Sequence, residues 1–419
     1  MSHEIKTRIE QANQKALSFL VEGQPVWTNV LYAREVVPGF KENMLLHAGP
    51  PLKPEQVVAP LKTSLCGAAI HEGFATSIED AWDMIMKGDL VLGSAQDHSC
   101  TCGAVMTISA STPLIVAEDQ TSGFQGYASI HPGHNPKTLR WGSYDEDVEK
   151  QLCWYRDVYG PQLGEAVRRM KGINIRALIA RTAGMGDEHH NRQMAASLAM
   201  ICDMIPPLLG STSPGRDQII NELVVNDRFF LHVLMAGAMS VVEAAKNIPM
   251  STLLVGFGGN GHVCGMQFSG TGKEWFTIPA PLILGQMLNP KWTEKDIVGQ
   301  IGDSTITEVY GFGGLASVAG PSYVRLTGGD FAEAQRRTNN ARQVCLAEHK
   351  WAPIPWDDFR GPPVGIDMRK VVATGIVPTS HGGSVHKDGG QAGAGSMPFP
   401  MECFKQGLRR FSEVIKEGI

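Results

Sequence analysis

The pattern of apolar and polar positions divides the chain into three regions. Residues 1–142 mix short apolar runs with helical patterns, whereas apolar residues in 143–249 recur at the three- and four-residue spacing of helices. Residues 250–419 return to short apolar runs separated by glycine-rich turns. The pattern predicts an α+β fold in which two mixed α/β domains, 1–142 and 250–419, flank a central helical domain, 143–249.

Local signals mark several elements within these regions. Ser77 followed by Asp80 predicts the start of a helix, because a hydroxyl and a carboxylate satisfy the free N–H groups of a first turn. The continuous apolar run 113–117 predicts a buried strand. Helical spacing of apolar residues predicts one helix over 159–183 and another over 187–204.

Composition and charge exclude several classes of protein. The 419 residues are 43% hydrophobic and 19% charged, which is enough apolar material for a large core and excludes a disordered chain. A net charge of −5 gives no electrostatic footprint for nucleic acid or an anionic membrane. We find no bilayer-spanning apolar stretch and no signal peptide, and the eight cysteines are scattered. We therefore expect a cytoplasmic protein.

The densest cluster of polar residues is Met-Gly-Asp-Glu-His-His-Asn-Arg at 185–192. Asp187 is expected to cap the helix that follows, so that His190, Asn191 and Arg192 project from its first turn. Free N–H groups and the helix dipole favour an anion at such a position. The alternative is that the two acidic residues only cap the helix.

Glycine accounts for 47 residues, and much of this excess stands in loops that also carry polar side chains. Residues 256–261 match the letters of G-x-G-x-x-G, but a strand and not a helix is expected after them. Asn260-Gly261 therefore predicts a β-hairpin, and dinucleotide binding is discounted. The loop 302–314 has backbone suited to phosphate, and Asp303 with Glu308 suits a hard cation, although a buried turn is an equal interpretation.

The cysteines provide no clear metal site or nucleophile. His98, Cys100 and Cys102 stand close together, but C-x-C is tighter than the usual zinc spacing and no second pair lies nearby. No metal ligand is assigned, and no cofactor is identified. Thiols among apolar residues are expected to be buried and inert, namely Cys66, Cys264 and Cys403.

Five motifs together resemble, in order and spacing, the bacterial family catalogued as domain of unknown function 1116. They are H-A-G-P-P at 47–51, M-G-D-E-x-H-N-R at 185–192, G-D-S-x-I-T-E-x-x-G-x-G-G at 302–314, F-R-G-x-P-x-G-I-D at 359–367 and G-A-G…P-M-E-C-F at 393–404. The resemblance spans nearly the whole chain. It implies a subunit of oxamate carbamoyltransferase, which converts oxalurate and phosphate into oxamate and carbamoyl phosphate in anaerobic allantoin degradation.

The resemblance also implies partners. One partner subunit is similar to the alpha chain of succinyl-CoA synthetase, and we expect a homo-oligomer. The sequence departs from the family pattern at 95–106, 131–133 and 226–230. A divergent subfamily with another carbamoyl or amide substrate fits equally well.

Carbamoyl transfer sets the roles that the site residues must fill. It needs cations and N–H donors around developing oxyanions, and a proton donor or acceptor near the leaving nitrogen. For proton transfer we expect His190, Glu188, His47 or His386. For substrate binding we expect Asn191, Arg192, Asn260, Gly49, Asp303, Ser304, Arg360 and Asp367. For Arg360, the alternative is a structural ion pair.

Two other functions remain open. A metal-assisted amide or ring hydrolase would bring acidic and histidine side chains to one ion, from Asp187, Glu188, His190, His98 and Asp303. A non-catalytic subunit would instead use the polar loops as an interface with a partner.

Overall fold

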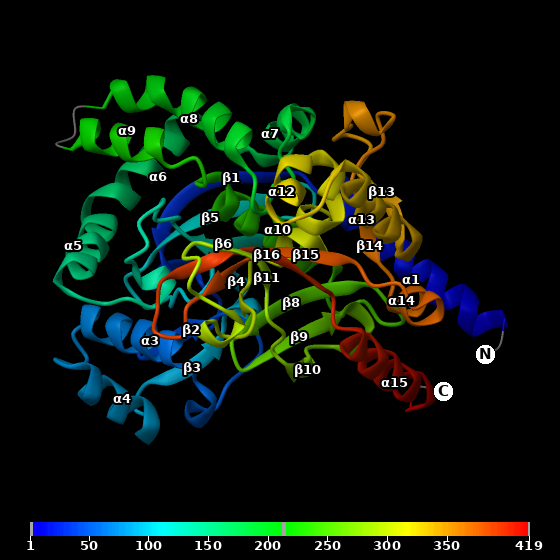
Figure 1. Cartoon of the computed structure of the whole chain (residues 1–419), viewed down its shortest axis with the longest axis horizontal. Coiled ribbons are helices and arrows are strands. Elements are labelled where there is room, and N and C mark those ends of the chain that lie inside the picture. Colours follow the sequence, from blue (N-terminus) through cyan, green and yellow to red (C-terminus); the bar gives the residue numbers. More distant parts are fainter. Residues whose placement is uncertain (1–2, 212–214, 418–419) are drawn as a thin grey trace.

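Strands from distant parts of the chain form several small sheets, and helices pack between and around them (Figure 1). The computed structural model describes residues 3–211 and 215–417. The mixture of helices and small sheets confirms the α+β class. Within this described part, no single helix combines the length and the apolar character needed to cross a membrane.

The largest sheet has five strands in the order β4-β6-β5-β1-β7. They are β1 (Pro25–Tyr32), β4 (Cys100–Thr101), β5 (Pro113–Asp119), β6 (Gln125–Ser129) and β7 (Ile173–Asn174). The buried strand predicted at 113–117 is thus confirmed as β5, which pairs antiparallel with β1. Helix α10 (Phe230–Ala245) packs on β5 and β6 and is buried almost all round, as its continuous apolar composition requires.

The second sheet contains the predicted hairpin. Its order is β10-β9-β8-β12, formed by β8 (Leu254–Asn260), β9 (Val263–Phe268), β10 (Phe276–Pro279) and β12 (Ile301–Gly302). The Asn260-Gly261 turn joins β8 to β9, and the Asn260 side-chain oxygen accepts hydrogen bonds from the N–H groups of His262 and Val263. A strand therefore follows the glycine-rich segment, as predicted.

Three smaller sheets complete the strands. One has the order β11-β16-β15, with β11 (Leu284–Met287), β15 (Thr379–Val385) and β16 (Gln391–Pro398). The other two pair β2 (Met44–His47) with β3 (Val91–Ser94), and β13 (Cys345–Glu348) with β14 (Pro363–Ile366).

The helices confirm some local predictions and correct others. The Ser77 hydroxyl accepts the N–H of Asp80 and caps α4 (Ile78–Lys87), as predicted. The single helix predicted over 159–183 is wrong: α6 (Gly160–Arg169) and α7 (Ile175–Thr182) are separated by β7 and by a turn in which Lys171 and Gly172 have positive φ. The helix predicted from 187 begins later, as α8 (Met194–Leu209).

The remaining α-helices surround these sheets. They are α1 (His3–Glu22), α2 (Ala33–Val36), α3 (Ala59–His71), α5 (Glu146–Trp154), α9 (Arg216–Val225), α11 (Ile306–Val309), α12 (Pro321–Leu326), α13 (Phe331–Val344), α14 (Met368–Thr374) and α15 (Met401–Glu417).

The first helix, α1, connects distant parts of the sequence. It packs against α10 and β14, and Asn13 on its buried face donates a 2.8 Å hydrogen bond to the Thr252 hydroxyl. The Asn13 oxygen accepts the N–H of Thr252 at 2.7 Å. One hydrophobic cluster extends from Ile9 to Phe411. The division into domains at 142 and 249 stays a prediction.

Candidate active site

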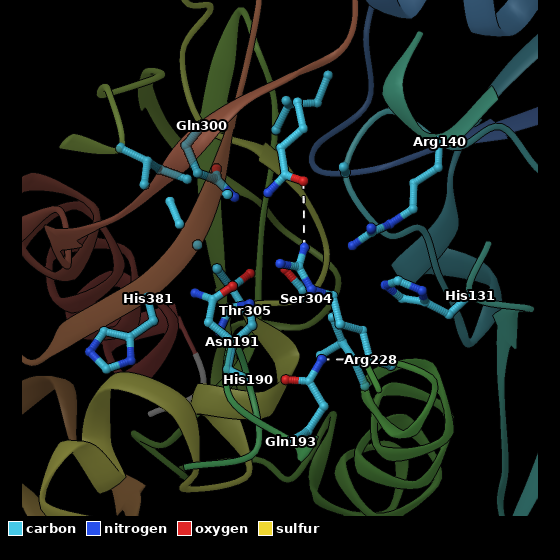
Figure 2. A pocket seen from close by; sticks show the side chains of 18 of the residues that line it. His131, Arg140, His190, Asn191, Gln193, Arg228, Gln300, Ser304, Thr305 and His381 are labelled. Carbon is cyan, nitrogen blue, oxygen red and sulfur yellow. Dashed lines mark hydrogen bonds between the residues drawn. The ribbon is translucent and has the colours of Figure 1, made fainter. Parts of the chain in front are cut away.

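A cavity lies where side chains from all three predicted regions meet (Figure 2). It encloses about 770 Å³ between protein atoms, its open mouth included. Its polar lining consists of His131, Arg140, His190, Asn191, Gln193, Arg228, Gln300, Ser304, Thr305, Tyr323, His381 and Gln391. Figure 2 shows Arg140 and His131 on one side of the cavity and His381 on the opposite side.

Two arginines bring positive charge into this cavity without a carboxylate to balance it. Arg140 is 7% exposed, stacks on the Trp141 ring, and its Nε has no hydrogen-bond partner among the described residues. Arg228, just before α10, donates a 3.4 Å hydrogen bond to the Gln391 amide oxygen. In the described part of the chain, neither guanidinium lies within ion-pair distance of a carboxylate. Burial, together with the charge of Arg228, lowers the pKa of Arg140 to about 9. An anion would relieve this uncompensated charge.

A buried histidine–carboxylate pair lies at the cavity, and its histidine, His190, is part of the lining. His190 Nδ1 lies 2.7 Å from Glu308 Oε1, and both side chains are buried. Glu308, on α11, also accepts the backbone N–H groups of Gly314 and His381, each at 3.0 Å. Burial opposes protonation of His190, but the charge and hydrogen bond of Glu308 outweigh it and raise the pKa of His190. Because Nδ1 is engaged, Nε2 is the ring nitrogen left for a ligand.

The loop that carries His190 is held by Glu188. The Glu188 carboxylate accepts the N–H groups of Asn191 at 2.6 Å, Arg192 at 2.7 Å and His190 at 3.2 Å. His381 Nδ1 lies 3.3 Å from its other side. Burial opposes ionisation of Glu188, but His381 and these N–H groups outweigh it and lower the pKa of Glu188. Glu188 is therefore an ionised positioning group behind the cavity, and the structure does not place it among the lining residues.

The predicted first-turn position of this cluster is wrong. His190, Asn191 and Arg192 lie in an irregular loop, and α8 starts only at Met194. Asp187 is not the N-cap residue, which is Gln193, but its carboxylate still accepts the first-turn N–H of Ala196 at 2.8 Å from outside the helix. The irregular loop before α8, and not the end of a helix, therefore holds these side chains in place.

The loop places its two candidate binding residues differently. Asn191 lines the cavity and donates a 2.9 Å hydrogen bond to the Tyr323 hydroxyl. Arg192 faces an adjoining outer hollow, where its Nε donates to the Gly186 carbonyl at 2.8 Å. Gln193 and Arg228 line both hollows, so the hollow that Arg192 lines adjoins the cavity, but Arg192 itself does not line the cavity.

Asp303 and Gly49 are hydrogen-bonded to each other, and neither lines the cavity. Asp303 is fully buried and accepts the Gly49 N–H at 2.9 Å, the Gln96 amide at 2.7 Å and the Cys102 N–H at 3.0 Å. Burial raises the pKa of Asp303 to about 7. Gly49 has φ +75°, and a Cβ there would lie 2.4 Å from the carbonyl carbon of Gly259, so this glycine allows two backbones to touch. Ser304, the next residue, does line the cavity.

The other predicted site residues lie outside the cavity lining. Asn260 donates to the Pro50 carbonyl. His47 is buried with Nδ1 at 2.8 Å from the Ala48 carbonyl oxygen, and burial lowers the pKa of His47. His386 packs on the Trp292 ring. Arg360 pairs with Glu348, and Asp367 pairs with Arg369 at 2.7 Å while it caps α14.

Acidic and histidine residues suggested for a metal-assisted hydrolase do not converge. Glu188 and Asp303 are saturated by N–H donors at different places, and His98 Nδ1 lies 2.9 Å from the Pro38 carbonyl oxygen. The three cysteines that were expected among apolar residues, Cys66, Cys264 and Cys403, are buried as predicted. Burial raises the pKa of Cys66 to about 11 and that of Cys403 to about 12. Burial also raises the pKa of the Cys264 thiol.

Of the twelve polar lining residues, sequence reasoning named only His190, Asn191 and Ser304 as site residues; above all it missed Arg140, Arg228 and His131. Arg140 lies between Leu139 and Trp141 in the sequence. These two large apolar neighbours were the one local signal that the arginine side chain is buried. His131 accepts the Gly133 N–H at Nδ1 and has no partner at Nε2 among the described residues. No sequence pattern links these three residues to one another.

The chain is similar to a protein family, to two curated proteins and to one solved structure. The family model for "Oxamate carbamoyltransferase subunit AllG" matches residues 90–304. The Escherichia coli K12 protein of that name is 32% identical over 420 residues, covering 98% of this chain and 100% of that protein. Uncharacterized protein YahG of the same organism is 32% identical over 410 residues, covering 97% and 86%. A crystal structure of a conserved protein of unknown function from Enterococcus faecalis V583 matches with a TM-score of 0.94 and 31% identity, covering 98% and 99%.

Proposed function

Because the chain belongs to the family of oxamate carbamoyltransferase subunit AllG, we propose that it is a subunit of such a carbamoyltransferase and that its cavity holds the reacting anions. The substrates would be a small oxalurate- or oxamate-like amide with phosphate or carbamoyl phosphate. The observation that carries this proposal is the pair of unbalanced guanidinium groups, Arg140 and Arg228, in one cavity.

The arginines suit the phosphate end of the reaction. Guanidinium groups bind phosphate and carboxylate through parallel N–H donors, and such hydrogen bonds are stronger where water is excluded. Two of them without acidic partners match a dianion better than a single charge. Asn191, Ser304 and His381 leave amide, hydroxyl and imidazole groups on the remaining walls for the carboxylate and amide of the second substrate.

His190 is the residue that suits proton transfer. In the direction that breaks the carbamoyl–nitrogen bond, a phosphate oxygen forms a bond to the carbamoyl carbon and the amide nitrogen leaves. That nitrogen needs a proton, which the imidazolium of His190 can donate from Nε2 while Glu308 stabilises the charged ring through Nδ1. In the reverse direction the neutral ring accepts the proton from the attacking nitrogen.

Partner subunits belong to the same proposal. The E. coli relative is named as a subunit, and a partner similar to the alpha chain of succinyl-CoA synthetase is the one that we expect. If the partner supplied all catalytic groups, this chain would be the non-catalytic subunit considered above.

The test combines binding and turnover. Calorimetry of the isolated chain with phosphate and carbamoyl phosphate should show binding that Arg140→Met and Arg228→Met each weaken at least about tenfold, the effect of one lost charged hydrogen bond. Arg409→Met, at an exposed α15 position paired with Glu402, is the control. Reconstitution with partner subunits, carbamoyl phosphate and a panel of amides then measures turnover. Absence of anion binding together with capture of the partner would favour the non-catalytic role.

A further inference from the structure

A second group of ligating side chains lies away from the cavity, between α3 and α5. His71 is the last residue of α3, and Glu149 and Cys153 lie one turn apart on α5. His71 Nδ1 lies 2.9 Å from Glu149 Oε1, and Cys153 Sγ lies 3.2 Å from the same oxygen. One nitrogen, one oxygen and one sulfur therefore all lie within 4.8 Å of one another.

We propose that His71, Glu149 and Cys153 form a zinc-binding site. Imidazole, carboxylate and thiolate are the three ligand types that zinc takes in proteins, at about 2.0–2.3 Å. Tetrahedral bonds of that length separate the ligand atoms by roughly 3.3–3.7 Å. The two distances to Glu149 Oε1, 2.9 and 3.2 Å, lie just below this range, and all three ligand atoms lie within 4.8 Å of one another, so small side-chain rotations would seat the ion. Glu149 is 34% exposed, which leaves a side open for a water molecule as fourth ligand.

The same contacts describe how the site would look without an ion. Glu149 accepts hydrogen bonds from His71, from the Cys153 thiol and, at 3.0 Å, from the Tyr144 hydroxyl. Burial and the Glu149 charge raise the pKa of the Cys153 thiol, which therefore keeps its proton. Zinc binding would release that proton to solvent, move the remaining His71 proton to Nε2, and replace both hydrogen bonds by metal–ligand bonds.

The position of the site indicates a structural role. Gly67 of α3 packs so closely on the Tyr144 ring that a Cβ would lie 2.6 Å from it, and Gly142 packs equally closely on Pro60. Helix α3 thus supports the segment 139–144, which carries Arg140 to the cavity. An ion that joins α3 to α5 would hold this segment from behind. The site goes beyond the proposed carbamoyl transfer and does not depend on it.

The test uses the full chain, stripped with a chelator and titrated with Zn²⁺ and with Co²⁺ in place of zinc. We expect one equivalent of either metal, and a near-ultraviolet thiolate-to-cobalt absorption band. Cys153→Ser should abolish the band and weaken binding at least about tenfold. Cys202→Ser removes an exposed thiol on α8 and should leave both unchanged. Less than one equivalent, or a band that survives Cys153→Ser, would overturn the site.

A second measurement needs no variant and so does not depend on the fold of one. Zinc should slow alkylation of Cys153 in the wild-type chain, followed by mass spectrometry, and should not slow alkylation of Cys202. Equal rates for Cys153 with and without zinc would exclude the site. Neither readout involves carbamoyl transfer, so failure here is distinguishable from failure of the proposed function.

Discussion

His190 Nδ1 and Glu308 Oε1 are 2.7 Å apart in a buried contact between the 186–193 loop and α11. The carboxylate is fixed by backbone N–H groups from Gly314 and His381, so it determines the orientation of the imidazole ring. A histidine oriented in this way by a carboxylate is a common arrangement for proton transfer.

Replacement of His190 tests this role. His190→Gln should lower kcat of the reconstituted enzyme by about 10²–10⁴, the usual contribution of general acid–base catalysis. Glu308→Gln should give a smaller loss, because the ring stays in place without its counter-charge. His262→Gln, at an exposed position, serves as the control. Wild-type turnover in His190→Gln would remove this residue from the mechanism.

Removal of the charge of Arg140 should have opposite effects on stability and on binding. Arg140→Met takes away a buried charge that has no acidic partner, so we expect the free energy of unfolding to rise by about 1 kcal/mol. Phosphate should stabilise the wild type in urea denaturation and should stabilise the variant much less. A variant that unfolds at clearly lower urea would show that the guanidinium has a structural role.

Asp303 should make stability depend on pH. The folded carboxyl keeps its proton up to about pH 7, whereas the unfolded carboxyl loses it near pH 3.9. Folded protein therefore binds more protons between these values, and the stability contributed by Asp303 falls as pH rises through the window, by up to about 1.4 kcal/mol per pH unit. Urea denaturation between pH ~5 and ~7 should show this slope in the wild type and not in Asp303→Asn. Parallel curves would contradict it.

Gly313 tests how closely the loops pack on the proton-transfer pair. It has φ +61°, and a Cβ would lie 2.3 Å from Glu308 Oε1 and 2.9 Å from His190 Cβ. Gly313→Ala should cost at least about 2 kcal/mol and most of the turnover, because strain adds to the clash. Gly375→Ala, with φ +71° and open space around it, should cost only about 1 kcal/mol. Equal losses would mean that backbone strain alone accounts for the effect.

Much of the fold followed from local patterns. Strand β5 and the β8–β9 hairpin are specified by apolar runs and by Asn260-Gly261, which act within a few residues. The single helix expected over 159–183 failed because β7 pairs with β1, a long-range contact that overrides helical spacing. Tertiary pairing of this kind leaves little trace in a local window.

The candidate site was predictable only in part, for a physical reason. The polar cluster at 185–192 drew attention to His190 and Asn191, and both line the cavity. Backbone N–H groups expected to bind an anion are instead bonded to the protein's own carboxylates, as Gly49 is to Asp303 and Gly314 to Glu308. Arg140 and Arg228 were not predicted as site residues, because the absence of a salt-bridge partner depends on three-dimensional packing and not on local sequence.

The contact between Asn13 and Thr252 also sets an order of events during synthesis. The two residues are 239 positions apart, so at roughly 10 residues per second the first helix leaves the ribosome about 20 s before its partner. Its apolar face, which includes Ile9 and Leu20, stays uncovered for that time. We expect the native core to close late in translation, and a chaperone that shields this helix to raise the yield of folded protein.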